Sequence, residues 1–164
     1  VSEGDRATKS GTFSDVGDDT VSLSASIGTV VDNGDGTVTD RSTGLIWQKT
    51  GSSMMTSKGK AQGYVSKLTE TRFARYGDWR LPTIEEFASL LERDQNNELH
   101  IDPVFDEKQK RCWSSDIRDD SVFREEVWIV EFVTGRLTAA YIASQGTDAS
   151  QFESNYVRAV SSIK

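Results

Sequence analysis

Apolar and polar residues alternate in the first part of the chain. From Val21 to Ile27 an apolar residue occupies every second position, with serines between. This period of two is typical of a strand with one buried face. Together with a turn over 15–19, the pattern predicts a β-hairpin extension at the N-terminus, spanning residues 1–28.

A second hairpin follows directly. Two short segments, 29–32 and 37–40, flank the sequence Asn-Gly-Asp-Gly at 33–36. Asn-Gly and Asp-Gly favour tight turns, because these residue types adopt positive φ at little cost. The next segment, 43–48, has the composition of a third strand, and it carries Trp47.

The pattern changes to a helical period in the middle of the chain. Apolar residues recur on one face of a helix that is predicted to start near Ser57: Ala61, Tyr64, Val65 and Leu68. A second helix is predicted after Pro82. There, Thr83 and Glu86 have the spacing of a capping box, in which each residue binds the backbone N–H of the other.

Strand patterns return from Cys112 onward. The predicted strands are 112–114, 127–132, 137–142 and 156–161, with a hairpin turn at Thr134 and Gly135. The helices are thus confined to the middle of the chain, without strand-helix-strand alternation. This order favours an α+β fold with two helices packed on an antiparallel β-sheet, as one domain over 29–164 after the N-terminal β extension.

The net charge and the composition disfavour some classes of binding partner. The 164 residues include 19 Lys and Arg against 26 Asp and Glu, which gives a net charge of −7. Such a charge disfavours binding to nucleic acid and to anionic lipid. The sequence also has no apolar run near the roughly 18 residues of a membrane span. We therefore expect no nucleic-acid partner and no membrane insertion.

The chain has few of the residues that enzyme centres commonly use. It contains one cysteine, Cys112, and one histidine, His100. This excludes an internal disulfide and a cysteine-rich zinc site, and it disfavours a histidine triad. Cys112 is interpreted as a small buried residue of a strand, because a redox role would need a partner thiol. No catalytic residue is identified, so a noncatalytic protein is expected.

Two acidic stretches raise the question of calcium. In 32–40, alternate positions after Asp32 fall on glycines, so the spacing of a calcium loop fails and a hairpin with Asp40 capping the next turn is preferred. The second stretch holds the calcium candidates Asp116, Asp119, Asp120 and Glu125. Arg118 and Arg124 would oppose a cation there, so a solvated charged loop is the competing interpretation. No cofactor is assigned, and calcium is the one cofactor that the sequence leaves open.

Two loops are the candidate binding surface, since binding residues gather on loops held by a rigid sheet. They are 116–126 and the polar stretch 144–155, which Tyr141 and Tyr156 bracket. Most other aromatic residues are interpreted as core. The candidate ligand-binding residues are Asp116, Arg118, Asp119, Asp120, Arg124, Tyr141, Gln151, Asn155 and Tyr156.

Several longer motifs go beyond such local patterns. They are DNGDGTVTD (32–40), TGLIWQK (43–49), DWRLPTIEEF (78–87), CWSS (112–115), VW (127–128) and YVR (156–158). In this order they resemble the Lcl C-terminal domain family, also called DUF1566, over residues 29–164. That family is a branch of the C-type-lectin-like superfamily. The resemblance implies a C-type-lectin-like fold, and structural roles for Arg80 and Arg158 as buried arginines.

The resemblance also implies a function and a location. Similar domains occur on secreted, periplasmic or cell-surface proteins of bacteria, as adhesin modules or variable ligand-binding proteins. It therefore implies a noncatalytic extracellular recognition domain for a glycan or protein ligand. A relative binds sulfated polysaccharide, but the charge of −7 favours neutral glycans or proteins here. The basic residues that could offset it are Lys58, Lys60, Lys67, Arg72, Arg75, Lys108, Lys110 and Arg111.

Two alternatives remain. The segment 80–83 with Glu86 is also similar to the helix start of formylglycine-generating enzymes, which implies an enzyme on that scaffold. Those enzymes use a pair of cysteines, whereas this chain has one. The other alternative is a structural or oligomerising module of a surface protein, so self-association into a homo-oligomer is left open.

Overall fold

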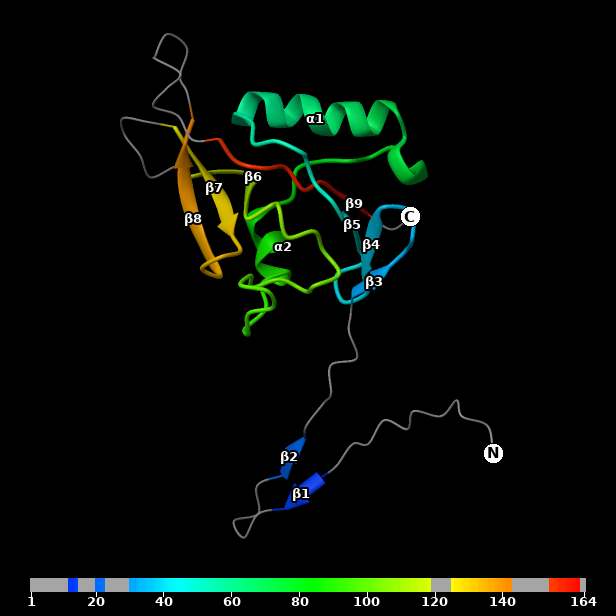
Figure 1. The fold of residues 1–164 in the computed structure, drawn as a ribbon, viewed down its shortest axis with the longest axis vertical. Coiled ribbons are helices and arrows are strands. Elements are labelled where there is room, and N and C mark those ends of the chain that lie inside the picture. Colours follow the sequence, from blue (N-terminus) through cyan, green and yellow to red (C-terminus); the bar gives the residue numbers. More distant parts are fainter. Residues whose placement is uncertain (1–11, 15–19, 23–29, 119–124, 143–153, 163–164) are drawn as a thin grey trace.

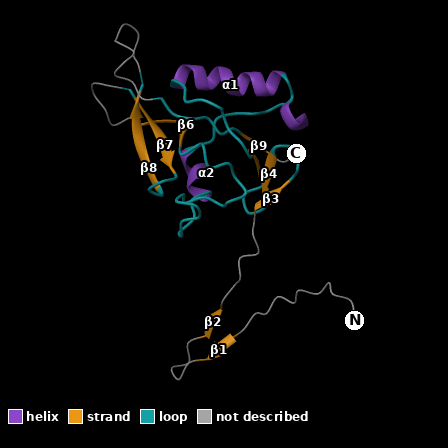
Figure 2. Cartoon of the chain, in the orientation of Figure 1, coloured by secondary structure: helices purple, strands orange, loops and turns teal. Residues whose placement is uncertain are grey.

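The computed structural model describes residues 12–14, 20–22, 30–118, 125–142 and 154–162, and it is a mixed α and β fold (Figures 1 and 2). The strands are β1 (Thr12–Ser14), β2 (Thr20–Ser22), β3 (Val30–Asp32), β4 (Thr37–Asp40), β5 (Leu45–Gln48), β6 (Arg111–Arg118), β7 (Glu126–Glu131), β8 (Arg136–Tyr141) and β9 (Val160–Ser162). The helices are α1 (Lys58–Glu70), the 3-10 helix η1 (Phe73–Arg75) and α2 (Ile84–Ser89). The α+β class with antiparallel pairing is confirmed, but the strands form separate sheets and not the single expected one.

The N-terminal strands β1 and β2 pair antiparallel with each other. The alternating segment 21–27 is described only as far as Ser22, so most of the strand predicted there lies outside the described residues.

One sheet has the strand order β3-β4-β5-β9. The predicted hairpin between β3 and β4 is confirmed, with Gly34 and Gly36 at φ of 75° and 88°. Asp32 and Asp35 each accept the backbone N–H two residues ahead, which fixes the tip. Asp40 caps the following turn as expected, because its carboxylate accepts from Ser42 and Thr43.

The second sheet has the order β6-β7-β8. The turn at Thr134 and Gly135 joins β7 to β8, and Gly135 has a φ of 65°, as the hairpin prediction requires. β6 is longer than the predicted strand 112–114, and its pairing with β7 shifts register between Trp113 and Ile117. Between these two residues β6 advances four positions while β7 advances two, so the pairing of the two strands is interrupted there.

Both predicted helices form. α1 follows Ser57 at its N-cap and buries Ala61 and Val65. α2 begins at the capping box of Thr83 and Glu86, with both reciprocal hydrogen bonds present. The 3-10 turn η1 after α1 was not predicted from the sequence, since nothing in its local composition marks it.

The C-terminal segment 155–161 runs from the β6-β7-β8 sheet to the β3-β4-β5-β9 sheet, where it ends in β9, and it is almost entirely buried (Figure 1). Its backbone bonds to β6 at Arg111 and Trp113 and to β5 at Gln48. Core residues gather on both sides of it, around Trp47 and Phe87 on one side and around Trp113 on the other. Burying this segment therefore ties the two sheets into one unit.

The helices in the described part of the chain are too short or too polar to cross a membrane.

Candidate functional site

A row of charged and aromatic side chains lies on one face of the β6-β7-β8 sheet. The register pairs Arg118 with Glu126 and Glu126 with Tyr141, so one residue from each strand meets in this row. Trp128 lies two residues further along β7 and therefore points to the same face as Glu126. We call these four residues the Trp128 face.

The local sequence of β7 explains why these side chains face away from the core around Trp113. Val127 and Ile129 are fully buried, and they pack in the core around Trp113. Because successive side chains of a strand point to opposite sides, this burial directs Glu126 and Trp128 away from that core. The sequence predicts a strand at 127–132 but does not show which of its side chains point away from this core.

The Trp128 face is held by an ion pair and a cation-π contact. The Arg118 Nη1 lies 3.3 Å from the Glu126 Oε2, and the guanidinium carbon lies 5.4 Å from the centroid of the Trp128 ring. Each contact restricts the guanidinium, so the arginine is fixed before any ligand arrives. Beside this pair, Tyr141 is 40% exposed.

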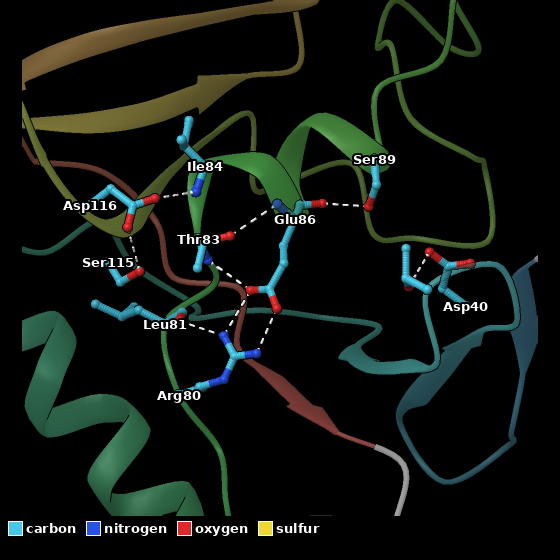
Figure 3. Close-up of polar contacts among 10 residues, drawn as sticks. Asp40, Arg80, Leu81, Thr83, Ile84, Glu86, Ser89, Ser115 and Asp116 are labelled. Atoms are coloured by element: carbon cyan, nitrogen blue, oxygen red, sulfur yellow. Dashed lines mark hydrogen bonds and ion pairs between the residues drawn. The ribbon is translucent and has the colours of Figure 1, made fainter.

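Two candidates of the predicted acidic loop lie in a strand of the structure. Asp116 and Arg118 were expected in a loop, but both belong to β6. Asp116 caps the start of α2, because its Oδ2 accepts the N–H of Ile84 at 2.5 Å (Figure 3). Its Oδ1 accepts the hydroxyl of Ser115 at 3.2 Å. The carboxylate thus has a structural use that its sequence position did not reveal.

The calcium candidates are only partly within the described residues. Asp119, Asp120, Arg124 and Gln151 lie outside the described residues. Glu125 is exposed, and its backbone carbonyl accepts the N–H of Ile142. Within the described ranges, no three His, Cys, Asp or Glu side chains are grouped so that they could hold a metal ion.

Two C-terminal candidates are less exposed than predicted. Asn155 was expected on the surface, but it is 0% exposed, and its backbone pairs with Thr56 in both directions. Tyr156 was expected to present its ring to a ligand. It is instead partly buried and packs against the core around Trp47. Of the predicted ligand-binding residues, the Trp128 face thus unites Arg118 and Tyr141, and it adds Glu126 and Trp128.

One residue of the predicted basic surface is turned inward. The ammonium of Lys58 donates to the backbone carbonyl of Ser114. Burial lowers its pKa to about 8, against the opposing effect of the Asp116 charge. Lys58 therefore directs its charge toward β6 and away from the solvent-facing side of α1.

The two structural arginines differ in exposure. Arg158 is fully buried as expected, and it donates to backbone carbonyls of β5 and of the loop before β6. Arg80 is not buried, since 42% of its side chain is exposed. It forms a bidentate pair with Glu86 at 2.7 and 2.6 Å (Figure 3). Burial alone would raise the pKa of Glu86, but the hydrogen bonds from Arg80 and from the Thr83 backbone outweigh it and lower that pKa.

Cys112 is buried in β6, as the sequence predicts. Burial raises the pKa of its thiol to about 12, although the nearby charge of Arg158 acts in the opposite direction. The thiolate is the reactive form of cysteine, so this site is unsuited to nucleophilic or redox chemistry at neutral pH.

Cys112 should therefore resist thiol reagents in the folded protein. At pH 7 its thiolate fraction is roughly a thousandfold below that of an unperturbed cysteine with a pKa of about 8.5. We expect almost no reaction with Ellman's reagent in buffer and complete reaction in guanidinium chloride. Equal rates under the two conditions would show that the thiol is accessible in the native state. The unfolded thiol ionises first as the pH rises, so this group contributes stability below about pH 8.5 that is lost at higher pH.

Comparison with known proteins gives one match. Residues 36–161 match the family model described as the Lcl C-terminal domain. Searches of curated proteins and of solved structures found no match.

Proposed function

The chain belongs to the Lcl C-terminal domain family, and on this premise we propose that it is a noncatalytic extracellular recognition domain of C-type-lectin-like fold. Its ligand is a glycan or a protein, bound through the Trp128 face and the loops next to it. The setting is a secreted, periplasmic or cell-surface protein of a bacterium, in the manner of an adhesin or a variable ligand-binding protein.

The observation that carries this proposal is the exposed Tyr141 ring beside a fixed Arg118–Glu126 pair. A sugar ring presents apolar C–H groups on its faces and hydroxyl groups around its edge. Aromatic rings pack against such C–H faces, while a guanidinium donates to hydroxyl oxygens and a carboxylate accepts from hydroxyl protons. A protein ligand can use the same groups, since aromatic residues and arginine are enriched at protein interfaces.

Charge supports a neutral glycan or a protein over a polyanion. The chain has a net charge of −7, and Arg118 on the Trp128 face is already paired with Glu126. A sulfated chain would meet the Glu126 carboxylate together with the arginine. The repulsion between the sulfate groups and the Glu126 carboxylate disfavours binding.

The buried Cys112 supports a noncatalytic role over the enzyme alternative. A formylglycine-generating reaction uses two accessible cysteines, whereas this chain has one, with a pKa of about 12. No arrangement among the described residues favours the alternative of a structural or oligomerising module.

A glycan array tests the proposal. We expect saturable binding to a neutral glycan, and at least a tenfold loss of affinity in Tyr141→Ala, because the exposed ring is removed without disturbing the core. Met54→Ala is the control, since Met54 is also exposed but lies outside the Trp128 face. Running the array in calcium and in excess chelator tests the calcium prediction separately.

The outcomes separate the alternatives. Binding that survives Tyr141→Ala unchanged would move the site away from the Trp128 face. Absence of any glycan binding, with or without calcium, would remove glycans as the ligand class. Concentration-dependent self-association in that case, measured by analytical ultracentrifugation, would support the oligomerising module.

A further inference from the structure

A second site is formed by the tip of the β3–β4 hairpin and the η1 turn. A cavity of about 520 Å³ opens there, lined by Asp35, Ala74, Arg75 and Tyr76. Its volume lies within the roughly 300–1,000 Å³ of typical small-molecule sites. None of these residues belongs to the Trp128 face, so the cavity is independent of the function proposed above.

The backbone around this cavity is strained. Arg72, Ala74 and Arg75 have φ values of 50°, 49° and 72°, in the left-handed region that residues with a Cβ rarely adopt. Strain of this kind persists only where the surroundings enforce it, and it often occurs at ligand clamps. The strained backbone therefore makes this turn a candidate for ligand binding, in addition to its connection of α1 to the next segment.

Two contacts hold the strained turn in place. The indole N–H of Trp79 donates to the carbonyl of Phe73 at 3.0 Å. The Phe73 ring packs on Gly36 of the hairpin so closely that a Cβ at Gly36 would lie 3.2 Å from the ring. The hairpin tip and the turn are thus fixed relative to each other, which gives the cavity a preformed shape. Tyr76, at its wall, packs edge-on against Trp79 with 5.8 Å between ring centroids.

The cavity wall carries one negative and one positive charge that do not neutralise each other. Asp35 uses its Oδ1 to accept from the N–H and the hydroxyl of Thr37, at 3.0 and 2.6 Å, and no hydrogen bond among the described residues involves its Oδ2. In the part of the chain that the structure covers, Arg75 forms no side-chain hydrogen bond, and neither residue takes part in an ion pair. A ligand with one charge of each sign would satisfy both.

We propose that this cavity binds a small zwitterion of the α-amino-acid class. The ligand ammonium lies at the Asp35 carboxylate, the ligand carboxylate at the Arg75 guanidinium, and the ligand side chain against the Tyr76 ring. A ligand with only one charge would leave the opposite charge of the cavity unpaired. The interior of a peptide chain has neither terminal charge, so the free amino acid is the fitting form.

The test is a nuclear magnetic resonance titration of the intact chain with the twenty proteinogenic L-amino acids, each up to about 10 mM, where even weak binding is seen. We expect one or more of them to shift the amide resonances of Asp35, Ala74 and Tyr76 in a saturable way. The N-acetyl derivative and the methyl ester of each binder, which lack one of the two charges, should bind at least tenfold more weakly.

Two arginines at strained positions provide a matched pair of variants. Arg75→Gly removes the cavity's guanidinium and Arg72→Gly removes one that does not line it, while glycine tolerates the positive φ at both. We expect at least a tenfold loss of affinity in Arg75→Gly and in Asp35→Asn, which keeps an oxygen acceptor for Thr37. Arg72→Gly should bind as the unchanged protein does.

Absence of shifts with all twenty amino acids would overturn the proposal. So would equal affinity for the singly charged derivatives, or equal loss in Arg72→Gly and Arg75→Gly. Tyr141→Ala should leave the titration unchanged, so failure here and failure of the glycan test are distinguishable.

Discussion

Replacing Arg158 with methionine is expected to destabilise the fold by about 3 kcal/mol or more, one of the largest effects of any single substitution outside the apolar core. For a chain of this length, such a loss lowers the melting temperature by about 6 to 12 °C. Thermal unfolding followed by circular dichroism measures it.

The reason lies in the acceptors that Arg158 satisfies. Its Nη1 donates to the carbonyls of Gln48 and Lys49, and its Nη2 donates to the carbonyl of Asp106 and to the side chain of Gln109. Methionine fills much of the same volume but donates no hydrogen bond, and of the four oxygens the Lys49 carbonyl keeps the N–H of Asp106 as a donor. Each buried acceptor that loses its partner costs about 1–3 kcal/mol. The gain from no longer burying a charge offsets part of this cost.

Arg80→Met is the matched control. Arg80 likewise donates hydrogen bonds through its guanidinium, two of them to the carboxylate of Glu86. In contrast to Arg158, however, 42% of the Arg80 side chain is exposed. Water can replace the lost donors there, so the expected loss is about 1 kcal/mol or less. Similar losses in the two variants would show that burial of the acceptors is not what makes Arg158 important.

Arg158 also illustrates what the sequence could and could not predict. The capping box of α2 and the hairpin around Gly34 were predictable, because their signals lie within four residues of each other. The partners of Arg158 lie as far away as Gln48, 110 positions earlier in the chain. A buried role for Arg158 was reached only through the resemblance to a family, which carries such long-range information.

The candidate site shows the same limit. Arg118 and Tyr141 were predicted from the composition of their surroundings, but the register that joins them through Glu126 is a property of the folded sheet. Asn155 was placed on the surface because its neighbours in sequence are polar. It is buried, because the C-terminal segment runs against residues near Thr56. Polarity along the chain does not show which backbone strand will cover a residue.

The strained backbone of residues 72–75 could not be predicted from the sequence either. Nothing in the residue types of Arg72, Ala74 and Arg75 indicates positive φ, since glycine and asparagine are the usual residues there. Packing of Phe73 on Gly36 enforces it from a segment more than thirty positions away. The cavity proposed to bind an amino acid therefore has no sequence motif that would have revealed it.

The close approach of the C-terminal segment to residues 51–56 leads to the second large prediction. Gly51→Ala should destabilise the protein by about 3 kcal/mol, at the upper end of what overpacking costs. A Cβ at Gly51 would lie 2.1 Å from the backbone carbonyl oxygen of Val157 and 3.0 Å from the Cγ of Gln109. The backbone cannot move away freely, because the same carbonyl accepts the N–H of Ser52 at 2.7 Å.

Gly63→Ala is the control that separates this clash from the general effect of a methyl group. Gly63 lies within α1, and a Cβ there would have no neighbour within 4 Å. Alanine is the better helix former, so this variant should be more stable by about 0.5–1 kcal/mol. Urea unfolding of both variants is expected to give shifts of opposite sign. A Gly51→Ala protein as stable as the parent would mean that segments 51–56 and 155–157 can separate without cost. The C-terminal segment would then not be what ties the two sheets together.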